Sequence, residues 1–137
     1  MAARNDTHTD LEHCSYVLHE NGIHEFIINH PTKRAADELI GYINTKLNDI
    51  PPYQTVRELV NFSAGVPPIA YLARRGREMM TSSTSPKLRV AFLYEQSTVM
   101  TILRTLVDLV QLDTVHVKAF RTRQRGEALE WLLKEER

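Results

Sequence analysis

The stretch LVNFSAGVPPIAYL, residues 59–72, decides how the chain is predicted to fold. It opens with an apolar run that has the length and composition of a strand and ends before Ser63. Turn residues follow up to Gly65, and Pro67-Pro68 precedes an amphipathic run that begins at Ile69. A strand that passes through a short turn into a helix is one half of a β-α-β unit. The stretch therefore predicts a parallel sheet with helices packed on it.

The segments on both sides continue this alternation. Upstream, two apolar runs flank Asn21-Gly22, a pair that favours a two-residue hairpin turn, and Thr32 is the predicted N-cap of a helix that ends before Pro51-Pro52. Downstream, the run VAFLY is apolar throughout, as in a strand covered on both faces. The predicted strands are 15–20, 23–29, 56–62, 90–94 and 114–120, and the predicted helices are 32–48, 67–80, 96–113 and 125–135.

The predicted fold class is α/β. We expect a single mixed, mostly parallel five-stranded sheet with an opening β-hairpin and four helices, because alternating strands and helices form right-handed parallel crossovers. Residues 1–13 are expected to be a flexible polar tail, and residues 14–137 one domain. A chain of 137 residues is long enough for one such core.

Composition narrows the choice of partner and compartment. Lys plus Arg and Asp plus Glu number 17 each, so nucleic acid is not an expected partner. Cys14 is the single cysteine, which excludes an intrachain disulfide and fits a reducing compartment. No apolar run is long enough to span a bilayer, and the N-terminus lacks the pattern of a signal peptide. We expect a cytoplasmic protein.

The end of the strand in residues 56–62 is the first candidate site. Ligands of open α/β sheets bind beyond the carboxyl ends of the strands, where helix N-termini favour anions. Asn61, Ser63 and Gly65 lie there and could hold a small anion or an acidic loop of a partner. The alternative is structural, because a serine N-cap and a glycine turn account for the same residues.

Metal binding and catalysis are not predicted. Four histidines lie near the hairpin, but they lack the spacing of a zinc site, and we expect them to be polar surface residues: His13, His19, His24 and His30. Cys14 is expected to be a partly buried structural thiol. No nucleophile, base and stabiliser assemble from the sequence, so we expect a protein that is not an enzyme and has no cofactor.

Two features suggest a partner. Arg74 and Arg75 lie on the second predicted helix and could dock an acidic surface or lipid headgroups. The third predicted helix has a wide apolar arc that includes Met100 and Leu109, and this arc either packs within the chain or contacts a second copy. Charge is also asymmetric, since residues 1–63 carry 5 basic and 9 acidic side chains and residues 64–137 carry 12 and 8.

The element order, the motif LVNFSAGV after the third predicted strand and the motif EALEWL near the end resemble the STAS-like family. The SpoIIAA-like group, related in fold to anti-sigma-factor antagonists and to Sec14-type domains, is the most similar. The resemblance covers roughly residues 15–134. It implies a small bacterial regulatory domain that binds a protein partner or itself, and the relation to Sec14-type carriers implies a lipid or another small apolar ligand as the alternative.

The sequence departs from the family at its phosphorylation site. Signalling members end the third strand with an Asp-Leu-Ser-like run, where this chain has Asn61, Phe62 and Ser63. They then carry an Asp-Ser-Ser-Gly-like turn whose serine a partner kinase phosphorylates, where this chain reads IAYL at residues 69–72. The resemblance therefore implies an interaction domain without the usual phosphoserine switch.

Overall fold

The computed structural model describes residues 7–51, 53–81, 87–95 and 115–134. Six strands form one sheet in the order of the chain, β1-β2-β3-β4-β5-β6. The strands β1 to β3 pair antiparallel, and β3 to β6 pair parallel. Their bounds are β1 Thr7–Asp10, β2 Cys14–Leu18, β3 His24–Ile28, β4 Thr55–Phe62, β5 Lys87–Tyr94 and β6 Val115–Arg121.

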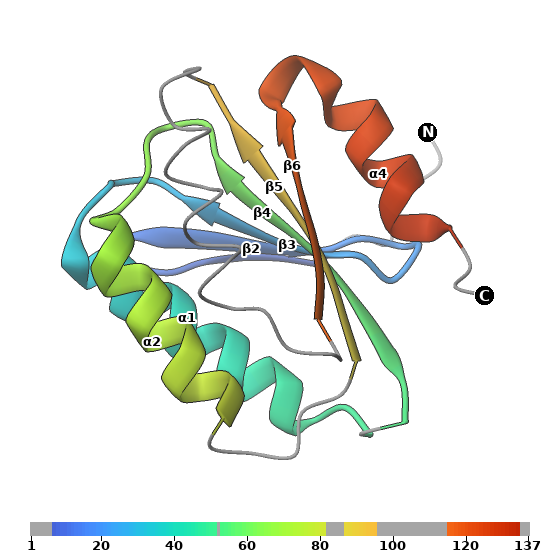
Figure 1. Cartoon of the computed structure of the whole chain (residues 1–137), viewed down its shortest axis with the longest axis horizontal. Coiled ribbons are helices and arrows are strands. Elements are labelled where there is room, and N and C mark those ends of the chain that lie inside the picture. The colour runs from blue at the N-terminus through green and yellow to red at the C-terminus, as the bar shows by residue number, and fades with distance from the viewer. Residues whose placement is uncertain (1–6, 52, 82–86, 96–114, 135–137) are drawn as a thin grey trace.

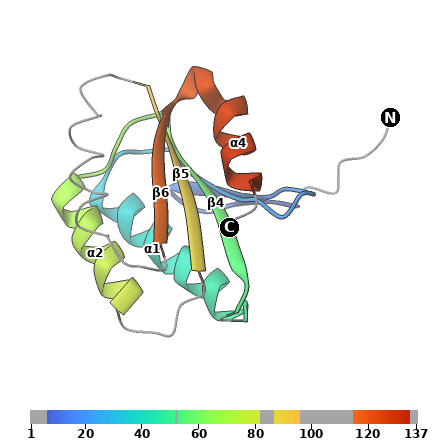
Figure 2. The same cartoon turned by 45° about the vertical axis from the view of Figure 1, so that its right-hand side comes forward.

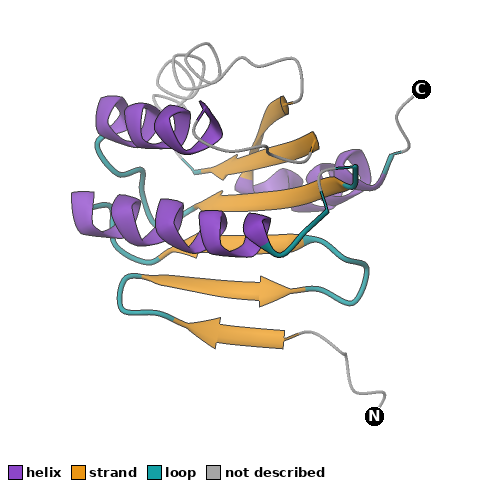
Figure 3. Cartoon of the chain, turned by 90° about the horizontal axis from the view of Figure 1, so that it is seen from below, coloured by secondary structure: helices purple, strands orange, loops and turns teal. Residues whose placement is uncertain are grey.

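Helices cover both faces of this sheet. The two longer helices, α1 (Lys33–Asn48) and α2 (Ile69–Thr81), lie side by side over one face, and α4 (Arg125–Leu133) covers the other (Figures 1 and 2). Figure 3 shows α1 and α2 lying over the sheet with their axes close to the direction of the strands. The predicted α/β class with a mixed sheet is thus confirmed. The predicted helix at 96–113, with Met100 and Leu109, lies outside the described residues.

The prediction of five strands is wrong, because β1 lies in the segment that was expected to be a polar tail. It pairs with β2 at the edge of the sheet, in a register that joins Thr7 to Leu18 and Asp10 to Ser15. The Ser15 hydroxyl also donates to the Asp10 carboxylate at 3.0 Å. Backbone pairing and such polar contacts hold an exposed edge strand, so no apolar alternation marks it in the sequence.

The hairpin between β2 and β3 differs from the predicted two-residue turn. Its loop has three residues, closed by a bond from the His19 N–H to the Ile23 carbonyl at 2.9 Å. Gly22 has φ of 88°, a left-handed conformation that glycine adopts without strain. Three-residue loops with glycine in this position are the next most common hairpin connection, so the Asn-Gly signal located the turn correctly but not its type.

The predicted helix cap is confirmed. Thr32 has an extended backbone, and its hydroxyl accepts a bond from the Ala35 N–H at 3.1 Å. This contact satisfies one of the N–H groups that the first turn of a helix leaves without an intrahelical partner.

Each face of the sheet has its own core. On the α1 and α2 face, β4 contributes Val56, Val60 and Phe62. On the α4 face, four helix residues, Ala128, Leu129, Trp131 and Leu132, pack with five side chains of the sheet and the hairpin, namely Ile23, Leu59, Ala91, Leu93 and Phe120. The alternation of β4 and β5 between the two faces explains why both strands are nearly continuously apolar.

The burial of Phe92 differs from what its apolar run VAFLY predicts, namely a strand covered on both faces. Phe92 is only partly buried, and its ring stacks on that of Phe62 with centroids 5.5 Å apart. Leu93, which points to the other face, is completely buried. Phe92 lines the pocket described below.

Two arginines from the sheet hold the end of α4. The Nε of Arg57 donates to the Leu132 carbonyl at 2.6 Å, and the Nε of Arg89 donates to the Trp131 carbonyl at 2.7 Å. The Arg89 guanidinium also lies 4.0 Å from the centre of the Trp131 ring. Because the last carbonyls of a helix have no intrahelical partner and carry negative partial charge, two cations stabilise this end.

A pair of neighbouring leucines tests the position of α4. Leu132 is fully buried and Leu133 is 44% exposed. We expect Leu132→Ala to lower the free energy of unfolding by about 2–5 kcal/mol, since it leaves a cavity, and Leu133→Ala to lower it by about 1 kcal/mol or less. Urea denaturation of both variants measures the difference. Equal losses would contradict the described packing of α4.

Candidate functional site

The predicted site residues Asn61, Ser63 and Gly65 do lie together in a turn at the carboxyl end of β4. The Asn61 side-chain oxygen accepts a bond from the Ser63 N–H at 2.9 Å, and the Ser63 hydroxyl pairs with that of Thr122 at 2.7 Å. The Gly65 N–H donates to the Phe62 carbonyl at 2.9 Å. The backbone donors that an anion would need from Ser63 and Gly65 are therefore engaged within the turn.

Gly65 is required by this turn for two reasons. Its φ of 134° lies in a region that residues with side chains rarely adopt. A Cβ at this position would also lie 3.1 Å from the Cβ and Cγ of Pro31. Ser63 is not the N-cap that the structural alternative assumed, because α2 begins at Ile69 and its first bond runs from Leu72 N–H to Pro68 carbonyl at 3.0 Å. Anion binding here stays a prediction.

The predicted basic surface on α2 makes contacts within the chain. Arg75 Nε lies 3.2 Å from the Asp37 carboxylate of α1, and its Nη1 lies 3.2 Å from Glu78. Arg74 Nε lies 3.8 Å from Glu78, and the Tyr71 hydroxyl donates to Asp37 at 2.6 Å. These contacts join α1 to α2. Tyr71, the one hydroxyl in the IAYL segment, belongs to this network.

A buried ion pair joins the hairpin to α4, and sequence reasoning missed it. Glu25 on β3 is 3% exposed and accepts two bonds from Arg125, at 2.6 and 2.8 Å. His19 lies 2.8 Å from the same carboxylate, and the Asn61 amide donates to it at 3.4 Å. Burial alone would raise the pKa of Glu25, but the bonds from Arg125, His19 and Asn61 lower it below its ordinary value.

The histidines of the hairpin are therefore not simple surface residues. His19 contacts Glu25, and the His24 Nδ1 lies 2.6 Å from the Tyr16 hydroxyl on the face covered by α1. Burial, and then the Lys46 charge, lower the pKa of His24. Burial, followed by the nearby Tyr42 and Glu58, raises the pKa of Tyr16 to about 12.

Cys14 is a buried thiol at the start of β2, as the structural interpretation of the sequence expects. Its Sγ donates to the Ala35 carbonyl at 3.4 Å, and burial raises its pKa to about 12, with Glu38 adding to the effect. A thiol of this pKa is protonated and unreactive at neutral pH.

Glu12, His13 and Glu38 lie close enough together to be ligands of one metal ion. One Glu38 oxygen, however, already accepts hydrogen bonds from the N–H groups of His13 and Cys14 at 2.8 and 3.0 Å.

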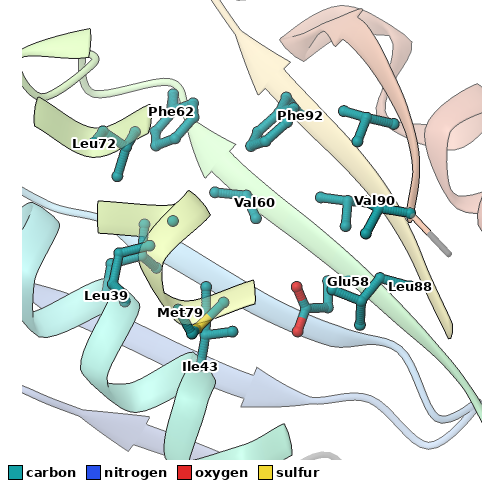
Figure 4. Close-up of a pocket in the computed structure, with 14 residues that line it drawn as sticks. Leu39, Ile43, Glu58, Val60, Phe62, Leu72, Met79, Leu88, Val90 and Phe92 are labelled. Atoms are coloured by element: carbon teal, nitrogen blue, oxygen red, sulfur yellow. The ribbon is translucent and has the colours of Figure 1, made fainter. Parts of the chain in front are cut away.

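A pocket lies on the face of the sheet covered by α1 and α2, between these helices and the strands β4, β5 and β6 (Figure 4). Its volume is about 80 Å³. Its walls are formed by Leu39, Ile40, Ile43, Glu58, Val60, Phe62, Leu72, Gly76, Met79, Leu88, Val90, Phe92, Val115 and Val117. The lining is apolar apart from one carboxyl group.

That carboxyl belongs to Glu58, which points from β4 into the space beside Ile43 and Met79 (Figure 4). Glu58 is 2% exposed, and its Oε2 has no hydrogen-bond partner in the part of the chain that the structure describes. Burial raises the pKa of Glu58 to about 8. A buried carboxyl without a partner is rare in folded proteins, so this residue is the strongest candidate for a functional group.

The sequence contains one signal for Glu58 that the strand prediction did not use. Glu58 stands at the same alternating face of β4 as Val56, Val60 and Phe62, all of which are buried. A charged residue on the buried face of an internal strand differs from one on a solvated face. The sequence does not show that α1 and α2 cover this face of β4, so it does not reveal that Glu58 is buried.

Comparison with known proteins gives no match to a family model, a curated protein or a solved structure. The STAS-like resemblance thus stays a prediction. Among the described residues, no helix combines the length and apolar character needed to cross a membrane.

The pH dependence of stability tests the burial of Glu58. The folded state keeps a proton on this carboxyl that the unfolded chain releases above pH 4.5, so stability is lost as the pH rises from 4.5 to about 8. The slope from this group is about 1.4 kcal/mol per pH unit. We expect Glu58→Gln to remove this slope and to be more stable than the wild type above pH 7. Urea denaturation at several pH values measures it, and parallel pH profiles would refute the assignment.

Glu25 should show the opposite pH dependence. Its lowered pKa means that its contribution to stability is complete above pH 4.5 and is lost as the pH falls through the folded-state pKa. We expect Glu25→Gln to destabilise the protein by about 2 kcal/mol at pH 6, since it breaks a largely buried pair, and by less at pH 3. Glu130→Gln, at an exposed position of α4, is the control and should change little. A pH-independent effect of Glu25→Gln would contradict this role.

Proposed function

We propose that this protein is a non-catalytic binding module that holds a small apolar molecule in the pocket between the sheet and the helices α1 and α2. The observation that carries the proposal is an apolar cavity, formed by five elements of the fold, with one carboxyl in its wall whose Oε2 has no hydrogen-bond partner among the described residues. Binding pockets combine such an apolar lining with a few polar groups that orient the ligand.

The size of the pocket favours a small ligand over a membrane lipid. A volume of about 80 Å³ is smaller than the ~150 Å³ of a cavity that takes up benzene, so the pocket holds a short chain or part of a ring, whereas a diacyl lipid needs many times that volume. Within the class of ligands that the Sec14-type relation implies, a small apolar molecule is therefore the better candidate.

Binding of a protein partner, or of a second copy in a STAS-like regulatory complex, is the alternative. Two observations give it less support in the described part of the chain. Tyr53 and Leu133 are the large hydrophobic residues exposed there, and they do not make an extended apolar patch. Arg74 and Arg75 contact Glu78, and Arg75 also contacts Asp37, within the same chain.

The absence of catalysis is supported by the state of the reactive groups near the pocket. The Tyr16 hydroxyl is bonded to His24, and the Cys14 thiol is bonded to the Ala35 carbonyl. Glu58 has neither a nucleophile nor a second carboxyl among its described contacts. Acid–base and nucleophilic mechanisms need such pairs within hydrogen-bond reach.

A pocket-filling variant tests the proposal directly. Val117 on β6 lines the pocket, whereas its neighbour Lys118 is exposed and points to the opposite face of the sheet. We expect the wild type to bind a neutral fluorescent naphthalene dye, and Val117→Phe to weaken binding by about tenfold or more, because the added ring takes up the space. Fluorescence titration gives the dissociation constants.

Lys118→Phe is the matched control, since it adds the same ring one residue away on the other face. It should bind the dye as the wild type does. Denaturation curves establish that both variants are folded. Equal loss of binding in the two variants, or a folded wild type that does not bind the dye, would refute binding in this pocket.

A further inference from the structure

We infer that Glu58 selects apolar ligands that carry one neutral oxygen acceptor, such as a ketone or an ester carbonyl, by donating its carboxyl hydrogen to that oxygen inside the pocket. This inference rests on the proposed function and adds the chemical class of the ligand. It starts from geometry, since the side chain is 2% exposed, lines the cavity and has an oxygen without a described partner.

The protonated form of Glu58 is the one that suits this role. A neutral carboxyl has an O–H donor, whereas a carboxylate can only accept. Burial disfavours the charge and raises the pKa of Glu58 to about 8, so the group is mostly protonated at neutral pH. With no other polar side chain among the described pocket residues, a ligand oxygen is the partner that the donor lacks.

The surroundings of Glu58 disfavour a cationic ligand. Tyr16 on β2 and His24 on β3 are bonded to each other, and His24 pairs with Glu58 in the β3–β4 register. From α1 the charged group is Lys46, whose Nζ lies 4.9 Å from the Tyr16 ring and 5.2 Å from the Tyr42 ring.

The remaining walls of the pocket, from α2, β5 and β6, contribute Leu72, Gly76, Met79, Phe92 and further aliphatic residues without charge. An amine would bring a second cation near Lys46, and it would also require Glu58 to ionise in apolar surroundings. Both effects oppose its binding.

Three probes of almost equal shape separate the possibilities. Acetophenone carries a carbonyl oxygen, α-methylstyrene has a methylene group in place of that oxygen, and 1-phenylethylamine carries an ammonium group. Each has nine non-hydrogen atoms. Dissociation constants are measured by NMR titration of the full chain between pH 6.5 and 9.5, a range at or above the ordinary pKa of His24, which burial lowers.

At pH 6.5 we expect acetophenone to bind about tenfold more tightly than α-methylstyrene, the typical net effect of one hydrogen bond. This preference should fall above pH 8 as Glu58 ionises, while the affinity for α-methylstyrene changes less. The amine should bind more weakly than acetophenone at pH 6.5.

Two variants separate donation by Glu58 from a purely structural role. Glu58→Gln keeps a donor N–H of similar reach, so the preference for acetophenone should remain but no longer depend on pH. Glu58→Leu removes the donor, so the preference should reverse in favour of α-methylstyrene, because the acetophenone oxygen then gives up its hydrogen bonds to water without a replacement. A structural role alone would not move the preference or its pH profile in this way.

The outcomes distinguish this inference from the proposed function. If both neutral probes bind equally to the wild type and Val117→Phe weakens both, the pocket binds apolar molecules but Glu58 does not select them, and the inference fails alone. Tighter binding of the amine, increasing with pH, would also overturn it. If no probe binds at concentrations up to their solubility, both proposals fail.

Discussion

The structure depends on β4 being covered on both faces. The strand lies between β3 and β5, and its side chains alternate between the face covered by α1 and α2 and the face covered by α4. Val56, Val60 and Phe62 enter the first core, and Leu59 enters the second. Such a strand has no solvated face on which to place a charge, and every polar residue in it must find a partner or carry a cost.

The polar residues that β4 sends toward α4 have partners, and these contacts organise that side of the sheet. Arg57 holds the Leu132 carbonyl near the end of the helix, and Asn61 contacts both the Ser63 N–H and the Glu25 carboxylate. Together with Arg125, these bonds join the opening hairpin, the central strand and the closing helix. Segments distant in sequence are therefore fixed to one another by a few partly buried polar contacts.

How much the sequence could predict follows from what each element buries. Strands β2 to β6 and the helices α1 and α2 bury apolar faces whose pattern is visible in the sequence, whereas α4 has an apolar composition without a clear helical period. The strand β1 could not be predicted because THTD buries little and is held by backbone pairing. The pair of Glu25 and Arg125 could not be predicted either, since it spans 100 residues and depends on the strand order. The turn at Asn61 and Ser63 was predicted at the right place, but its hydrogen bonds were not predicted.

Glu25 and Glu58 show how burial alone fails to identify a functional carboxyl. Both are almost fully buried in the same sheet, but Glu25 is surrounded by Arg125, His19 and Asn61, which lower its pKa. Glu58 faces an apolar cavity, and its pKa is raised to about 8. The first arrangement stabilises the fold and leaves no bonding capacity unused. The arrangement of Glu58 lowers the stability of the folded state at neutral pH. Replacing Glu58 by an apolar residue would break no polar contact among the described residues. A buried carboxyl with that cost, in the wall of a cavity, fits the ligand selection proposed above better than a role in stabilising the fold.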